Sequence, residues 1–153
     1  MKLEKDSITL PFRSTEVHRP WGFYGLYSDN EKCTSKILYV KKGETLSLQY
    51  HFKRDQFYLI LDDDFTIDYS TLPVDQNSII GLDDDARTDY FNNFLKTNMV
   101  TEQASDGDMF GFQRFILHRA VYNGDKEYGR ILDIAFGEND EGDIVRLDDK
   151  YGR

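Results

Sequence analysis

The feature that most constrains the fold is a series of short apolar runs between residues 35 and 69. In the run TLSLQYHF, Gln49 and His51 share one face of a strand, because side chains two apart point the same way. Leu48 and Tyr50 share the opposite face. The runs SKILYV, FYLIL and FTIDYS accompany it, and acidic or glycine-bearing turns separate them. We therefore expect strands that pair in sequence as an antiparallel meander.

A second β region spans residues 110–136, where FGFQRFILHRAVY and RILDIAF flank the turn NGDKEYG. Between the two regions, aromatic residues of ARTDYFNNFLKTNM recur at helical spacing behind a run of acids that suits a helix N-terminus. We expect one short helix over 84–98, inside an insertion spanning 70–109. Residues 1–30 scatter prolines and glycines among aromatics, which indicates an irregular arm or short edge strands. The pattern predicts one mainly β domain over 1–153, a sandwich or a barrel.

Composition narrows the range of partners. The net charge of −9 over 153 residues repels phosphate backbones, so we expect no nucleic acid partner. No apolar run approaches the roughly 20 residues of a membrane span, and MKLEKDSITLPF lacks the apolar core of a signal peptide. The single cysteine, Cys33, fits a reducing compartment. We expect a cytoplasmic protein without a membrane partner. A few cations in a pocket would still allow this acidic protein to bind a small anion.

The sequence lacks a glycine-rich phosphate loop and the motifs CxxC, GxSxG and HExxH. Its histidines carry more information. Gln49 and His51 can turn an amide oxygen and an imidazole nitrogen into a barrel, and an antiparallel barrel can bring the strand of His118 opposite. The alternative interpretation is that His51 and His118 are ordinary half-buried histidines.

Four blocks carry a family resemblance: RPWGFY at 19–24, SKILYVKKGETLSLQYHFKR at 35–54, LHRAVYN at 117–123 and GDIVRLDDKYGR at 142–153. In this order they resemble the C-terminal cupin domain of type II mannose-6-phosphate isomerases, a domain often fused to GDP-mannose pyrophosphorylases. The resemblance implies an all-β fold of the cupin type, a double-stranded β-helix or jelly-roll barrel, with the short helix in an insertion.

The resemblance also implies a site for a divalent metal such as zinc or manganese. The family's glutamine, histidine, glutamate and second histidine ligands fall on Gln49, His51, Gln56 and His118. At position 56 the anionic ligand is therefore missing, and a bulge could present Asp55 in its place. Carboxylates balance the charge of the ion in most such sites, so we expect a metal that is weakly held or absent.

The implied reaction interconverts mannose 6-phosphate and fructose 6-phosphate through an enediol. It needs an acid–base group, a cation or dipole at the oxyanion, and fixed positive charge at the phosphate. Arg54 is the candidate cation, or else a surface arginine paired with an acid. Lys36 and Glu44 are candidate acid–base groups.

Further candidates to bind the substrate lie in the first and last blocks. Trp21 and Tyr24 could stack on a sugar ring, although core packing is the competing interpretation for Trp21. Arg146 and Arg153 could fold over the pocket or brace a dimer. We expect a homodimer, since an open sheet edge favours a partner.

Two functions from different classes remain open. The first is a metal-dependent isomerase that acts on a small phosphorylated sugar. The second is a non-catalytic cupin that binds a sugar, a nucleotide sugar or a protein partner. The retained blocks favour the first function, and Gln56 favours the second.

Overall fold

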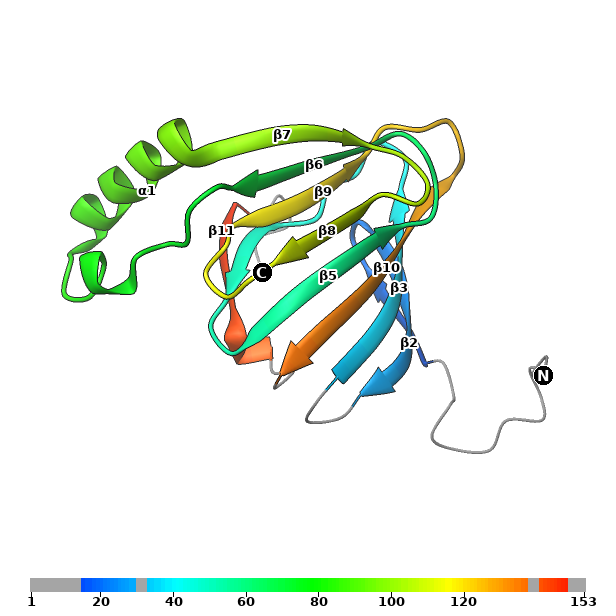
Figure 1. Ribbon diagram of the computed structural model, residues 1–153, viewed down its shortest axis with the longest axis horizontal. Coiled ribbons are helices and arrows are strands. Elements are labelled where there is room, and N and C mark those ends of the chain that lie inside the picture. The colour runs from blue at the N-terminus through cyan, green and yellow to red at the C-terminus, as the bar shows by residue number, and fades with distance from the viewer. Residues whose placement is uncertain (1–14, 30–32, 138–140, 149–153) are drawn as a thin grey trace.

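The computed structural model describes residues 15–29, 33–137 and 141–148, which form two antiparallel sheets with one helix outside them (Figure 1). The six-stranded sheet, in spatial order, contains β1 (Thr15–Arg19), β2 (Gly22–Asp29), β3 (Cys33–Lys41), β10 (Tyr128–Gly137), β5 (Arg54–Ile60) and β8 (Met109–Phe112). The five-stranded sheet contains β11 (Ile144–Asp148), β4 (Leu48–His51), β9 (His118–Tyr122), β6 (Phe65–Ser70) and β7 (Met99–Ala104). The expected mainly β architecture of two sheets with one helix is confirmed.

The meander expected over residues 35–69 is wrong, because its strands β3, β4, β5 and β6 alternate between the two sheets. β3 pairs with β2 and β10, whereas the next strand, β4, pairs with β9 and β11. β5 returns to the first sheet between β10 and β8. Alternation along a strand shows which face is buried and carries no information about the neighbouring strand. The repeated crossing between sheets is what gives the sandwich its jelly-roll character.

The space between the sheets holds the main core. Val40, Ile60, Phe65, Ile67 and Ile131 are completely buried there. They come from strands of both sheets, so each sheet turns one apolar face inward. The polar cluster described below lies among these inward-facing positions.

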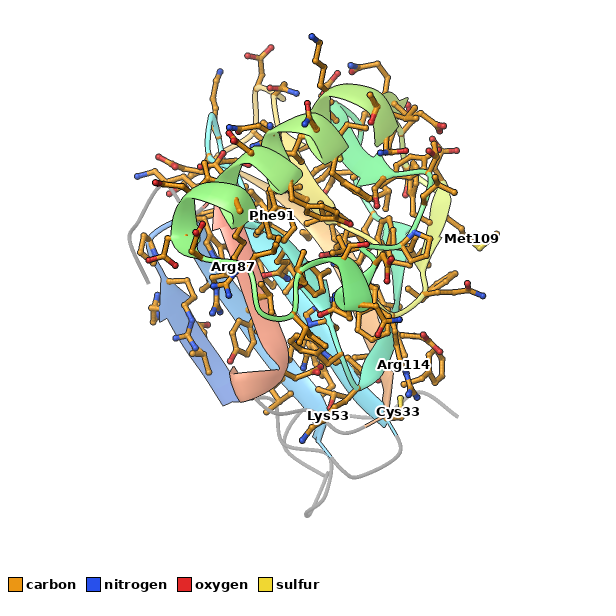
Figure 2. The ribbon with its side chains drawn as sticks, turned by 90° about the vertical axis from the view of Figure 1, so that its left-hand side faces the viewer. Cys33, Lys53, Arg87, Phe91, Met109 and Arg114 are labelled. Carbon is orange, nitrogen blue, oxygen red and sulfur yellow. The ribbon has the colours of Figure 1, made fainter. Side chains whose placement is uncertain are left out.

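The predicted helix is confirmed as α1 (Asp84–Asn98). Asp83 caps it, since its carboxylate accepts a hydrogen bond from the Ala86 amide at 2.9 Å. Phe91 and Phe94 pack into a second apolar cluster with Tyr50 of β4. Figure 2 shows α1, with Phe91, lying over the outer face of the five-stranded sheet. The helix therefore covers Tyr50, and the opposite face of β4 is left to line the interior.

The expected insertion contributes more than a helix. After a short 3-10 turn, η1 (Gln76–Ser78), and α1, the chain forms β7, which pairs along its whole length with β6. At one edge of the six-stranded sheet, residues 15–29 form strands β1 and β2, which agrees with the short edge strands expected for this region. The remaining part of the expected arm, 1–14, lies outside the described residues. Within the described ranges, no helix is long and apolar enough to cross a membrane.

The turn between β1 and β2 explains the glycine of the first block. Gly22 has φ of +143°, and a Cβ atom there would lie 1.9 Å from the carbonyl oxygen of Tyr39. Only glycine permits this close approach. The Lys41 amide also donates to the Trp21 carbonyl at 2.7 Å. These contacts hold Trp21 against β3, with its side chain toward the interior.

Candidate functional site

A polar cavity of about 80 Å³ opens between the two sheets. Its walls come from β1, β2, β3, β4, β5, β10 and β11, from the turn between β1 and β2 and from the segment that leads into β4. Among the residues singled out from the sequence, those that line this cavity are Trp21, Tyr24, Lys36, Gln49, Arg54, Gln56 and Arg146. Asp133, which was not among the sequence-based candidates, also lines it.

Two imidazoles lie one layer deeper, behind Gln56. The Gln56 amide oxygen is 2.9 Å from His51 Nε2 and 2.7 Å from His118 Nε2. The two rings come from β4 and β9 and are 2% and 1% exposed. Phe112 stacks on the His118 ring with centroids 4.3 Å apart. The structure thus brings His51, Gln56 and His118, three of the four positions on which the family's metal ligands fall, into one cluster.

Hydrogen bonds fix the protonation of each ring. Ile116 offers only a carbonyl oxygen, 3.0 Å from His118 Nδ1, so that nitrogen carries the proton and Nε2 has a lone pair. On the other ring, Arg54 Nε donates to His51 Nδ1 at 3.3 Å, so His51 carries its proton on Nε2. Burial is the main cause that lowers the pKa of His51 to about 2 and that of His118 to about 4. Both rings are therefore neutral at pH 7.

This arrangement sets two acceptors against each other. His118 Nε2 and Gln56 Oε1 both present lone pairs, and they face each other at 2.7 Å. Two acceptors at that distance are stabilised by a positive ion between them. Two imidazole nitrogens and an amide oxygen are ligand atoms that fit a metal cation. To bind it, His51 would move its proton to Nδ1, which lies 3.7 Å from a carboxylate oxygen of Asp143.

The two remaining ligand candidates behave differently. Gln49 lies opposite His118 in the register of β4 and β9, so the two share the inner face of the sheet. Its amide oxygen accepts from the Ser47 hydroxyl at 2.8 Å. Asp55 is exposed and accepts from the Arg114 amide at 2.9 Å. Because successive strand residues alternate faces, the structure brings Gln56 to the imidazoles and turns Asp55 away.

The structure adds two buried acids to the sequence-based candidates. Asp143 is 1% exposed, and its Oδ1 accepts from the amides of Phe52 and Lys53 at 2.8 and 2.6 Å. These bonds anchor the turn between β4 and β5, which carries ligand candidates on both sides. Its Oδ2 lies 3.6 Å from Arg54 Nε. The sequence could have pointed to Asp143, because this residue belongs to GDIVR in the block at 142–153 that carries the family resemblance.

Asp133 is the second added acid. It is 5% exposed and accepts from Gln56 Nε2 at 2.7 Å. Burial raises the pKa of this carboxyl, while Lys36, the Gln56 hydrogen bond and Arg54 act to lower it. Its signal in the sequence is the placement of an acid on the same strand face as the apolar Ile131 and Ala135.

Positive charge gathers along the cavity. Arg54 is 4% exposed and sits inside, next to His51 and Asp143, rather than on the surface. Lys36 Nζ and Arg19 Cζ lie 5.1 and 5.5 Å from the centroid of the Tyr24 ring, a cation–π arrangement. Cations and an aromatic ring thus share one wall of the cavity.

Other candidates lie elsewhere. Glu44 follows the turn after β3 and does not line the cavity. Arg153 lies outside the described residues. Within the ranges that the structure describes, no three His, Cys, Asp or Glu side chains group as metal ligands. A metal held here would therefore depend on glutamine oxygen as well as imidazole.

A jelly-roll sandwich with histidines from neighbouring strands on the inner side of one sheet is the architecture of a cupin. A family model described as Mannose-6-phosphate isomerase C-terminal matches residues 9–89, more than half of the chain, and the chain belongs to this family. The matched span contains the blocks at 19–24 and 35–54. The blocks at 117–123 and 142–153 lie beyond it.

Solved structures agree on the fold. The capsular polysaccharide assembling protein CapF from Staphylococcus aureus matches 96% of this chain with a TM-score of 0.62 and 11% identity. This chain spans only 35% of CapF. KdgF from Halomonas sp. matches 84% of this chain and 92% of its own, with a TM-score of 0.56 and 12% identity.

A variant of Streptomyces PAC13 with uridine matches 89% of this chain and 86% of its own, with a TM-score of 0.58 and 8% identity. At such identities these similarities show the fold alone. A search of curated protein sequences gave no match.

Proposed function

We propose that this chain binds a phosphorylated sugar in its polar cavity and interconverts mannose 6-phosphate and fructose 6-phosphate. The observation that carries the proposal is the joining of two groups of residues at one cavity. The first group is the pair of imidazoles, which Gln56 connects to the cavity. The second group is a set of cations that line the cavity from four strands: Arg19, Lys36, Arg54 and Arg146. Membership in the mannose-6-phosphate isomerase C-terminal family supports the same substrate class.

The size of the cavity suggests how the substrate binds. At about 80 Å³ it is smaller than the roughly 300–1,000 Å³ of pockets that enclose a whole ligand. The reacting end of an open-chain sugar would enter it, while the phosphate stays outside. Arg19 and Arg146 are only half-buried, so they are placed to meet the phosphate at the opening. Trp21 and Tyr24 would pack against the carbon chain.

The residues divide the chemistry between them. Lys36, which lines the cavity, is the proposed group that removes the proton from one carbon and returns it to the next. Gln56, His51 and His118 would hold a divalent ion, with Gln49 beside them. Such an ion would supply a Lewis acid for the carbonyl oxygen. Arg54 would orient the sugar, since its hydrogen bond to His51 Nδ1 would be given up once that nitrogen carries the proton.

A second function is favoured by one specific observation. The four aligned ligand positions contain no carboxylate, and Gln56 already contacts both imidazoles. A cupin with this composition could bind the sugar phosphate without isomerising it. The two functions share a ligand and differ in turnover.

An assay of turnover separates the two functions. Protein loaded with manganese would be incubated with mannose 6-phosphate, and fructose 6-phosphate would be followed by NMR spectroscopy. We expect conversion by the native chain, loss of conversion in His118→Ala, and full conversion in Asp89→Ala, whose exposed side chain lies on α1. Binding without conversion would favour the second function. Absence of both binding and conversion would overturn the proposal.

A further inference from the structure

We propose that Asp133 supplies the negative charge that the metal centre lacks at position 56, and that it acts through the Gln56 amide. This inference rests on the proposed function, since it assumes that the imidazole cluster holds a divalent ion. It makes Asp133 a positioning residue, behind the side chains that would contact the ion. In this chain the carboxylate would stand at Asp133, the hydrogen-bond partner of Gln56, and not at the ligand position 56 itself.

The geometry links Asp133 to the imidazoles through a single side chain. Its Oδ1 accepts from Gln56 Nε2 at 2.7 Å, and Gln56 Oε1 lies 2.7 Å from the Nε2 atom of His118. A carboxylate only accepts hydrogen bonds, so it holds the NH₂ end of the amide and directs the oxygen toward the rings. Asp133 thereby decides which end of Gln56 the ion would meet.

The same bond alters the ligand itself. An amide that donates to a carboxylate is polarised, and its oxygen becomes more negative. Partners of this kind, behind the direct ligands, tune metal affinity in many sites. Gln56 and Asp133 together would therefore act as one weakly anionic ligand. Neither residue would do so alone.

The charges around Asp133 explain why its removal would matter. In the strand register it lies opposite Lys36 of β3 and Tyr58 of β5, and Arg54 of β5 also faces the cavity. If Asp133 were removed, Asp143 would be left to balance the charges of Lys36 and Arg54, among the buried acids described in this site. A dication would then enter a region of excess positive charge.

A double-mutant cycle tests the inference by its sign. Manganese affinity would be measured by isothermal titration on metal-free protein for the native chain, Asp133→Asn, Gln56→Glu and the double variant. In the native background we expect Asp133→Asn to weaken binding about tenfold. We expect Gln56→Glu to tighten it several-fold, as the restored carboxylate offsets the charge of the ion.

In the Gln56→Glu background the effect of Asp133→Asn should reverse. Two carboxylates would face each other there across the former hydrogen bond, and each would disfavour the charge of the other. Removing the carboxylate of Asp133 should then strengthen manganese binding or leave it unchanged. A residue that merely supports the fold would weaken binding in both backgrounds.

Two further variants serve as controls. Asp133→Glu keeps the charge and should retain more affinity than Asp133→Asn, while Asp89→Asn on the exposed face of α1 should bind like the native chain. Circular dichroism would verify that each variant is folded. Equal affinities of the native chain and Asp133→Asn, or losses in both backgrounds, would overturn the inference alone. Failure of every variant to bind manganese would overturn the proposed metal site and this inference with it.

Discussion

At the scale of single residues, Asp62 shows how this acidic chain uses a buried carboxylate. Its side chain is 4% exposed and accepts from Lys126 Nζ and Arg130 Nε, each at 2.7 Å. It also accepts from the Arg130 amide at 3.0 Å. The Arg130 bond is the main cause that lowers the pKa of Asp62 to about 2. The interaction ties the end of β5 to β10.

We expect Asp62→Asn to lower the free energy of unfolding by about 1–2 kcal/mol at pH 7, since water reaches both cations and screens the pair. The pKa is lower in the folded chain than its ordinary value of 3.8. The stabilisation is therefore complete above about pH 4 and is lost as pH falls through 2. Urea unfolding of the native chain and the variant should show a gap at pH 7 that narrows below pH 4. A gap that is independent of pH would contradict this origin.

At the scale of elements, the helix depends on its first cap. The Asp83 carboxylate satisfies the Ala86 amide, one of the donors that no helical carbonyl can reach. We expect Asp83→Ala to cost about 1 kcal/mol in thermal unfolding. Asp89→Ala, inside the same helix and exposed, should change stability by less than about 0.5 kcal/mol. Equal effects of the two variants would show that the cap contributes nothing specific.

What could be predicted from the sequence was local. The helix bounds and the shared face of Gln49 and His51 follow from periodicity and capping, which act within a few residues. Strand pairing did not follow, because the partners of β3 and β4 are set by closure of the whole sandwich. The same limit hid Asp133: its role depends on Gln56, a residue on the neighbouring strand that is distant in sequence.

At the scale of the whole molecule, the described strands leave four sheet edges, at β1, β8, β11 and β7. Such edges present unpaired backbone groups that a second copy can cover. We expect a homodimer, with a mass by light scattering of about twice the 17.9 kDa of the chain at micromolar concentration. A single-chain mass under these conditions would contradict it.

The proposed function depends on one cavity, in which cations and an imidazole cluster together would recognise a phosphorylated sugar. Calorimetry of mannose 6-phosphate and of mannose, each with the native chain and with Arg146→Met, tests this most directly. We predict that mannose 6-phosphate binds at least about tenfold more tightly than mannose, and that Arg146→Met narrows this difference in affinity. Equal binding of the two sugars, or no binding of either, would contradict recognition of a sugar phosphate at this cavity.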